Sequence, residues 1–152
     1  MSAVQLPDAR VVEPVQDWAA VENARLVNEA RAALLKSGSA VSIDTIASAL
    51  GKQPDTVRQW VGRHRRAGQL VSVTHDGQVY VPSFQLTPAF DHVDDAVAGV
   101  VRRLTDYGMD GWAVWDWFQT PNTWLDGDVP ADLLAAGDLE AVLGAVAGLL
   151  QE

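Results

Sequence analysis

The chain has 152 residues, 48% of them hydrophobic, and a formal net charge of -9 at neutral pH. This length allows one ordinary domain or two small ones with a real core. No apolar run approaches the roughly 20 residues needed to cross a bilayer, and the absence of cysteine excludes disulfides, thiolate metal sites and cysteine nucleophiles. We therefore expect a globular, cytoplasmic protein that does not enter a membrane.

The acidic excess lies entirely in the last third of the chain. Residues 1–103 hold 11 basic and 11 acidic side chains, whereas residues 104–152 hold no basic and 9 acidic ones. A chain divided in this way indicates two surfaces with different partners, one with a basic patch and the other acidic and aromatic. The alternative is that acidic side chains only maintain solubility, and the charges alone leave both open.

The first part of the chain predicts a flexible arm and then an amphipathic helix. Residues 1–14 contain two prolines and no apolar periodicity, so we expect a flexible arm there. From Asp17 to Lys36, apolar residues recur at helical spacing, and Ser37-Gly38 supplies a stop. The apolar positions are Trp18, Val21, Ala24, Val27, Ala30 and Leu34.

Residues 42–67 predict a helix-turn-helix. Ser42 caps a short helix that ends at Gly51, and Pro54 opens a second helix that ends near Ala67. Segment 52–66 has five basic residues and one acidic residue. Because arginine neutralises phosphates and pairs with guanine edges, exposed arginines on the second helix favour DNA binding. The alternative is a structural helical unit with a solvated arginine face.

A β-hairpin is expected after the second helix. Residues 69–74 and 78–81 alternate apolar and polar side chains around His75-Asp76-Gly77, and Asp-Gly between such runs is a strong hairpin signal. A hairpin in this place is a wing, with Thr74, His75 and Gln78 near its tip. The predicted contacts with double-stranded operator DNA are Lys52, Gln53, Thr56, Arg58, Gln59, Arg63, Arg65, Arg66 and His75.

The remaining residues predict a packed connector and a small helical bundle. Residues 83–94 form the connector, and a helix is expected from Asp91 to Tyr107. Further helices are expected at 112–118, from Pro130 to Gly137, and at 139–150, where the face behind the apolar stripe is alanine and glycine. Such a helix packs closely on another backbone or self-associates. The fold class is mainly α with one small β-hairpin: a winged helix-turn-helix at 15–82 and a bundle at 95–152.

The bundle residues resemble the toxin-binding domain of Xre/ParS-type (MbcA-like) antitoxins. An aromatic-rich helix precedes the pattern Phe118-x-x-Pro121-Asn122-x-x-Leu125-x-Gly127-x-x-Pro130-x-x-Leu133-Leu134-x-x-Gly137. In that family the domain blocks a RES-domain toxin, an enzyme that consumes NAD, while a separate helix-turn-helix binds the operon's promoter. The family commonly carries an all-helical DNA-binding domain, so the wing is a departure. The resemblance implies partner contacts, several of them also core positions, at Trp112, Trp115, Trp117, Phe118, Asn122, Trp124, Leu125, Pro130, Leu133, Leu150, Gln151 and Glu152.

No catalytic or cofactor-binding motif is present. The sequence lacks Gly-x-Gly-x-x-Gly, a P-loop, Gly-x-Ser-x-Gly and His-Glu-x-x-His. The aspartates beside His92 predict the acidic first turn of a helix rather than a metal site. We therefore expect no enzyme, cofactor or metal. Three functions remain open: an antitoxin that binds a RES toxin and operator DNA, a stand-alone homodimeric transcription regulator, and a protein-interaction module without DNA binding.

Overall fold

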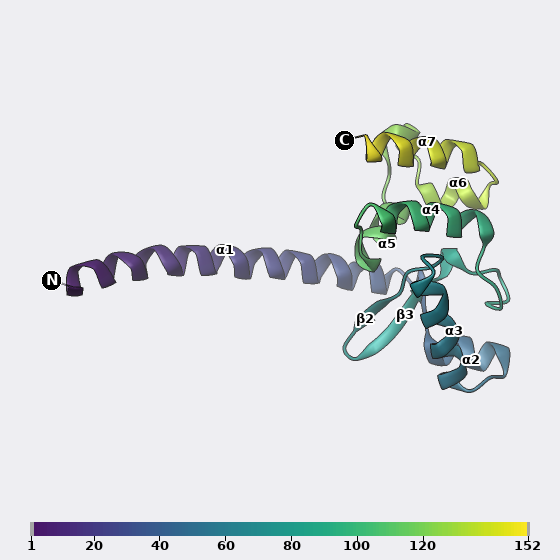
Figure 1. Ribbon diagram of the computed structural model, residues 1–152, viewed down its shortest axis with the longest axis horizontal. Helices are drawn as coiled ribbons and strands as arrows, with labels where there is room; N and C mark the ends of the chain where they lie inside the picture. The colour runs from purple at the N-terminus through teal and green to yellow at the C-terminus, as the bar shows by residue number, and fades with distance from the viewer. Residues whose placement is uncertain (1, 152) are drawn as a thin grey trace. The chain divides into compact units, whose positions relative to one another are not determined.

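The computed structural model describes the backbone of residues 2–151 and the side chains of residues 18–151. The chain forms two compact units, Met1–Ser37 and Gly38–Glu152, and each is treated by itself. Figure 1 shows their elements. The fold is mainly helical with a small antiparallel sheet, as predicted. No helix within residues 2–151 combines the length and apolar character needed to span a membrane.

The first unit is one long helix, α1, which spans Ser2–Lys36. The helix predicted from Asp17 is present and begins earlier, at Ser2, so it includes residues expected to belong to a flexible arm. Apolar periodicity reports packing against a core, and a helix can form its own backbone hydrogen bonds without it. Trp18 and Val21, two of the apolar positions of the predicted amphipathic helix, are 70% and 67% exposed.

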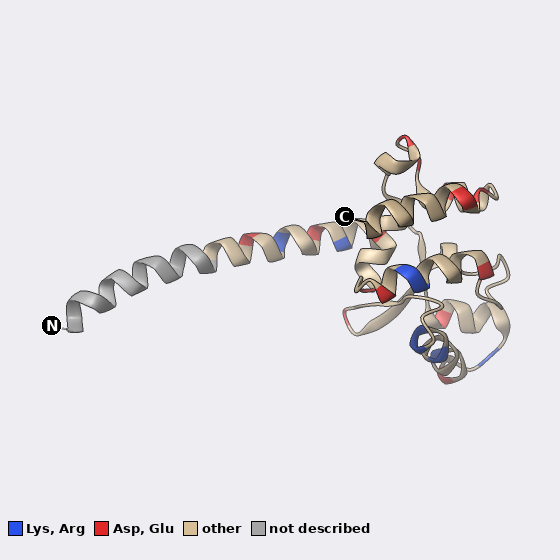
Figure 2. Ribbon diagram, turned by 45° about the horizontal axis from the view of Figure 1, so that its top comes forward, with Lys and Arg blue, Asp and Glu red and all other residues tan. Residues whose placement is uncertain are grey.

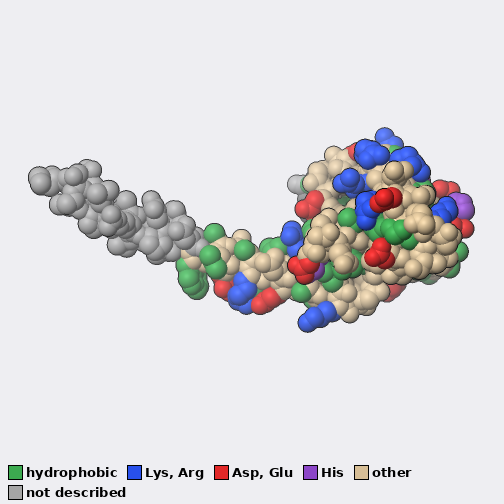
Figure 3. Space-filling view, turned by 90° about the horizontal axis from the view of Figure 1, so that it is seen from below, with side chains coloured by type: hydrophobic (Ala, Val, Ile, Leu, Met, Phe, Trp, Pro, Cys, Tyr) green, Lys and Arg blue, Asp and Glu red, His purple; other side chains and the backbone are tan. Residues whose placement is uncertain are grey.

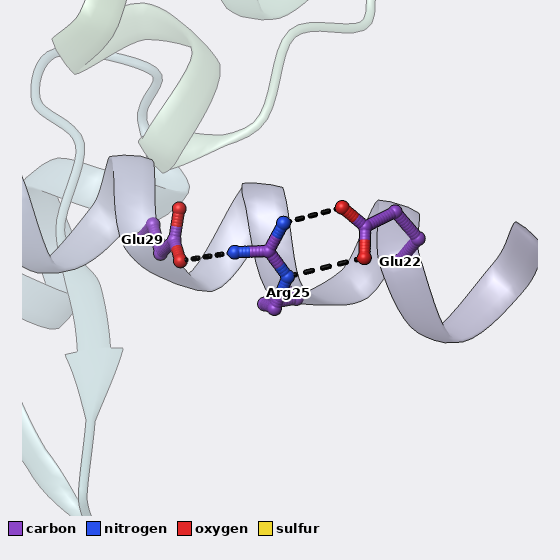
Figure 4. A network of polar contacts seen from close by, with 3 residues as sticks. All are labelled: Glu22, Arg25 and Glu29. Atoms are coloured by element: carbon purple, nitrogen blue, oxygen red, sulfur yellow. Dashed lines mark hydrogen bonds and ion pairs between the residues drawn. The ribbon is translucent and has the colours of Figure 1, made fainter.

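Charged side chains support α1 locally. The Arg25 guanidinium donates hydrogen bonds to both carboxylate oxygens of Glu22 and to Glu29 Oε1 at 2.6 Å (Figure 4). These residues lie three and four positions apart, which places them on one face of the helix. Since all three are solvent-exposed on one helix, the network stabilises the helix only slightly.

The second unit begins with a three-stranded antiparallel sheet. Its strands are β1 (Ala40–Ser42), β2 (Val73–His75) and β3 (Gln78–Pro82), in the order β1-β3-β2. The predicted hairpin is present, and Asp76 and Gly77 turn it with φ values of 50° and 76°. A two-residue hairpin turn of this type requires a positive φ at both central residues, which is why Asp-Gly favours it. Strand β1 was not predicted, because three residues are too few to show alternation.

The predicted helix-turn-helix is confirmed as α2 (Ile43–Leu50) and α3 (Pro54–Arg66). The Ser42 hydroxyl caps α2 by accepting the Thr45 N–H at 3.1 Å, and Gly51 ends it at φ 65°. One core joins these helices to the sheet. Its buried members are Ile43, Ile46, Ala47, Val57, Val61, Leu70, Val81 and Leu86.

The helical bundle follows the short helix η1 (Ser83–Gln85). It contains α4 (Asp95–Asp106), α5 (Gly111–Gln119), η2 (Thr123–Leu125), α6 (Pro130–Ala135) and α7 (Leu139–Leu150). Helix α4 starts at Asp95 rather than at Asp91, because the Asp94 carboxylate accepts the Val97 N–H at 3.1 Å and Phe90 has a φ of 64°. The bundle core includes Val100, Val101, Leu104, Val114, Phe118, Val142 and Val146.

The winged helix-turn-helix and the bundle are packed together as one unit. Gln85 lies inside the segment predicted to be a packed connector, and its side chain is fully buried. Its amide oxygen accepts the Val71 N–H at 2.7 Å, and its amide nitrogen donates to the carbonyls of Val71 at 2.9 Å and Pro82 at 3.1 Å. Val71 itself belongs to the bundle core. The boundary expected at 83–94 is therefore a shared packing region.

Candidate nucleic-acid interface

Helix α3 presents a basic face to solvent. Its inward residues Val57 and Val61 are buried, so the opposite side of the helix is exposed. The exposed side chains are those predicted from the sequence: Thr56, Arg58, Gln59, Arg63, Arg65 and Arg66, with Lys52 and Gln53 in the preceding turn. Figure 3 shows Lys and Arg side chains gathered on one face of the second unit.

Most of these cations have no acidic partner. Arg58 pairs with Asp55 at 2.5 Å, and both side chains are largely exposed. Among residues 18–151, Arg63, Arg65 and Arg66 form no ion pair. Their charges are therefore available to a polyanion, and Figure 2 shows the blue positions on α3.

The basic face continues onto the wing. One open depression lies along α3, and another lies between α3, the start of α2 and the hairpin turn. The first is lined by Asp55, Arg58, Gln59, Gly62, Arg63, Arg65 and Arg66, and the second by Ser42, Ile43, Asp44, Arg58, Gly77, Gln78 and Val79. Arg58 lines both, so the two form one surface from α3 to the hairpin turn. Asp44, which the sequence analysis did not single out, adds a negative charge at its edge.

His75 faces the bundle. Its ring meets Trp112 of α5 edge to face with centroids 6.5 Å apart, and its Nε2 lies 3.3 Å from an Asp76 carboxylate oxygen. The side chain is only 40% exposed. Of the predicted DNA contacts, His75 is thus the one that helps to support the hairpin instead of lying on the α3 surface. Gln78, also expected near the wing tip, does line that surface.

The aromatic motif is mostly core. Trp115, Phe118, Leu125 and Pro130 are buried, and Trp112, Trp117, Asn122 and Leu133 are half-buried. Only Trp124, Leu150 and Gln151 are exposed, and Glu152 lies outside the described residues. Asn122 has a structural task, since its side-chain oxygen accepts the Trp124 N–H at 2.8 Å. Three of the predicted partner contacts are therefore exposed on the described surface.

Two of the aspartates near His92 form the predicted acidic helix start: the Asp94 carboxylate caps α4 and Asp95 lies in its first turn, whereas Asp91 lies before the helix. Asp91 accepts a hydrogen bond from the Thr87 hydroxyl at 2.8 Å and lies 3.1 Å from His92 Nδ1. The Thr87 hydrogen bond, and then the bond from His92, hold the pKa of Asp91 below its usual value. Nowhere in the described chain do three or more His, Cys, Asp or Glu side chains meet in a group that could hold a metal ion.

Comparisons with known proteins bear on the fold. No family model matches the sequence, and no curated protein matches it. The chain is similar to the NMR structure of Rv2175c, with 28% sequence identity and a TM-score of 0.54, over 71% of this chain and 79% of that one. A match of this length exceeds what the winged helix-turn-helix or the bundle occupies alone, even with α1 added. It therefore extends over parts of both.

Proposed function

We propose that the chain is a DNA-binding regulator that places α3 in the major groove and lays the β2–β3 hairpin on the adjacent backbone. The observation that carries this proposal is the continuous surface on which Arg58 joins α3 to Gly77 and Gln78 of the hairpin. In winged helix-turn-helix proteins the second helix and the hairpin contact one duplex together. A surface shared by both elements fits that duplex.

The distribution of charge supports the same orientation. Segment 52–66 carries five basic residues and one acidic residue, although the whole chain has a net charge of -9. DNA attracts the first and repels the nine acidic side chains of residues 104–152. The chain therefore approaches a duplex with α3 foremost and its acidic C-terminal surface turned away.

The side chains on α3 divide into two roles. Arginine pairs with guanine and glutamine with adenine through two hydrogen bonds each, so Arg58, Gln59 and Arg63 suit contacts with base edges. Lys52, at the turn before α3, and Arg65 and Arg66, near its end, suit contacts with phosphates. Such a division gives the protein both affinity and sequence preference.

We predict that Arg58→Ala and Arg63→Ala each weaken operator binding by about 1 to 3 kcal/mol where the residue reads a base. If the residue contacts a phosphate instead, the loss of binding free energy is similar for all DNA sequences. The slope of log affinity against log salt concentration then becomes shallower by about one. Fluorescence anisotropy with the DNA upstream of the gene, across a salt series, measures both quantities. Arg103→Ala on α4 removes the same charge from an exposed position outside the surface described above and serves as the control. If Arg58→Ala and Arg63→Ala bind as tightly as the control, α3 does not contact DNA.

We predict the opposite change for Asp55→Asn. Asp55 is the acidic residue of the α3 surface and holds Arg58 in an exposed ion pair. Its replacement removes a repulsive charge and releases Arg58 to a phosphate, so DNA affinity at low salt rises severalfold. The same anisotropy assay measures the gain, and Asp132→Asn on α6, also exposed, is the matched control. Unchanged affinity for Asp55→Asn places the DNA elsewhere.

Toxin neutralisation is a second candidate, favoured by the exposure of Trp124 and Leu150 in the motif that resembles antitoxins. In that role the bundle binds a RES-type toxin and α3 binds the operon's own promoter. Co-expression with the protein encoded next to this chain tests it. A complex that restores growth supports neutralisation. If the neighbouring protein is not toxic and forms no complex with this chain, the stand-alone regulator is the function that remains. Light scattering of the free chain tests the expected homodimer.

A further inference from the structure

Trp124 is placed differently from the other tryptophans of the second unit. It is 56% exposed, whereas Trp115 is fully buried and Trp60, Trp112 and Trp117 are half-buried. A tryptophan in water exposes a large apolar ring, and in protein interfaces such residues dominate the binding energy. Its exposure therefore makes Trp124 a candidate for contact with a partner.

The backbone around Trp124 is fixed by its own hydrogen bonds. The Asn122 N–H donates to the Asp128 carbonyl at 3.0 Å, and the Gly127 N–H donates to the Asn122 carbonyl at 2.9 Å. Leu125, next to Trp124, is 7% exposed and anchors the loop in the bundle. Because the loop is closed and anchored, little conformational entropy is lost when Trp124 meets a partner.

The indole ring packs against α7. A Cβ at Gly148 of α7 would lie 2.5 to 2.9 Å from Cε2, Cδ2 and Cε3 of Trp124. The indole therefore lies across the backbone of α7 at a position that only glycine allows. One side of the ring rests on Gly148, while the residue as a whole is 56% exposed.

The charged side chains near Trp124 in the sequence are acidic. Asp126 and Asp128 belong to the same closed loop and are exposed, and residues 104–152 contain no lysine or arginine. Figure 2 shows this part of the chain with acidic positions in red. A guanidinium stacks on an indole face through its cation and its flat shape, and it also pairs with carboxylates. The chemistry of this surface thus fits an arginine side chain.

We propose that Trp124, with Asp126 and Asp128, is a docking site for an arginine of a basic segment in a partner protein. This inference goes beyond DNA binding and holds whether or not α3 contacts a duplex. It also requires no toxin.

The test is a titration with a short peptide of alternating arginine and glycine at physiological salt, followed through the tryptophan indole N–H signals in NMR spectra. The expected result is a saturable shift of the Trp124 signal. A peptide with lysine in place of arginine should bind more weakly, and one with glutamate in place of arginine should not bind. Gly148→Ala displaces the indole and lowers the affinity about tenfold or more. Gly144→Ala, one turn earlier on α7 with nothing within 4 Å of its Cβ, leaves the affinity unchanged.

A second pair of variants tests the charges without altering the ring. Asp126→Asn with Asp128→Asn weakens binding, and asparagine tolerates the left-handed φ of 54° at position 126. Glu140→Gln, eight residues before Gly148 and therefore about 12 Å away along α7, changes it little. Three outcomes overturn the proposal: no binding, equal binding by Gly148→Ala and Gly144→Ala, or a Trp124 shift that depends only on protein concentration. The last identifies a second copy as the occupant.

Discussion

Gly111→Ala is expected to destabilise the second unit by about 3 kcal/mol, at the upper end of the usual effect of overpacking. A Cβ at Gly111 would lie 2.3 Å from the Ser72 carbonyl oxygen and 3.4 Å from Val73 Cγ1. The obstacle is the backbone that leads into β2, and α5 is held in place by the fully buried Trp115. Neither side can move without loss of packing elsewhere. Urea unfolding measures the effect as a lower midpoint at an unchanged slope.

Gly99→Ala is the matched control for this prediction. Gly99 lies inside α4, and nothing is found within 4 Å of its Cβ position. Alanine favours the helix over glycine, so this variant should be about 0.5 to 1 kcal/mol more stable than the parent. Equal midpoints for the two variants would mean that Gly111 is not in close contact with Ser72.

The contact at Gly111 also concerns the surface proposed to bind DNA. The N-terminal end of α5 touches the chain just before the hairpin at Ser72, and Trp112 touches His75 in β2. Trp112 stacks in turn on Trp115, with ring centroids 5.7 Å apart. The aromatic helix therefore supports the wing from the bundle side. A ligand or partner that shifts α5 would alter the position of the hairpin relative to α3.

The elements that the sequence predicted have local signals. Ser42 three residues before Thr45, Pro54 at the start of α3 and Asp76-Gly77 in the hairpin each act within a few residues. Caps and turns of this kind are determined by neighbouring side chains, so they can be recognised without the tertiary structure. The basic face of α3 follows from helical periodicity alone, and its exposure was predicted for that reason.

The features that were not predicted depend on residues distant in sequence. Strand β1 exists because Val41 pairs with Val81, and the close approach of Gly111 to Ser72 joins α5 to the hairpin. Within the aromatic run, spacing did not distinguish Trp115, which is fully buried, from Trp124, which is 56% exposed. Burial depends on which elements cover a side chain, and that information is absent from a local pattern.

Gln85 is the clearest case of such a distant contact and leads to the second large effect. Gln85→Met is expected to destabilise the second unit by about 4 kcal/mol, since it leaves the Val71 N–H and two backbone carbonyls without their hydrogen bonds at similar side-chain volume. The side chain is fully buried, so water cannot replace the lost partners without opening the unit. Denaturant unfolding gives the free energy, and hydrogen exchange at the Val71 amide should lose its protection.

Ser83→Ala provides the comparison for Gln85→Met from the same short helix. Its hydroxyl donates to the Ser39 carbonyl at 3.0 Å, but the Ser83 N–H donates to that carbonyl as well at 2.8 Å. Because the carbonyl keeps one hydrogen bond, the loss should be about 1 kcal/mol or less. A loss for Gln85→Met no larger than that for Ser83→Ala would mean that the Gln85 amide does not hold the winged helix-turn-helix to the bundle. A much larger loss, with both parts unfolding in one transition, would support the role of the Gln85 side chain in joining the winged helix-turn-helix to the bundle.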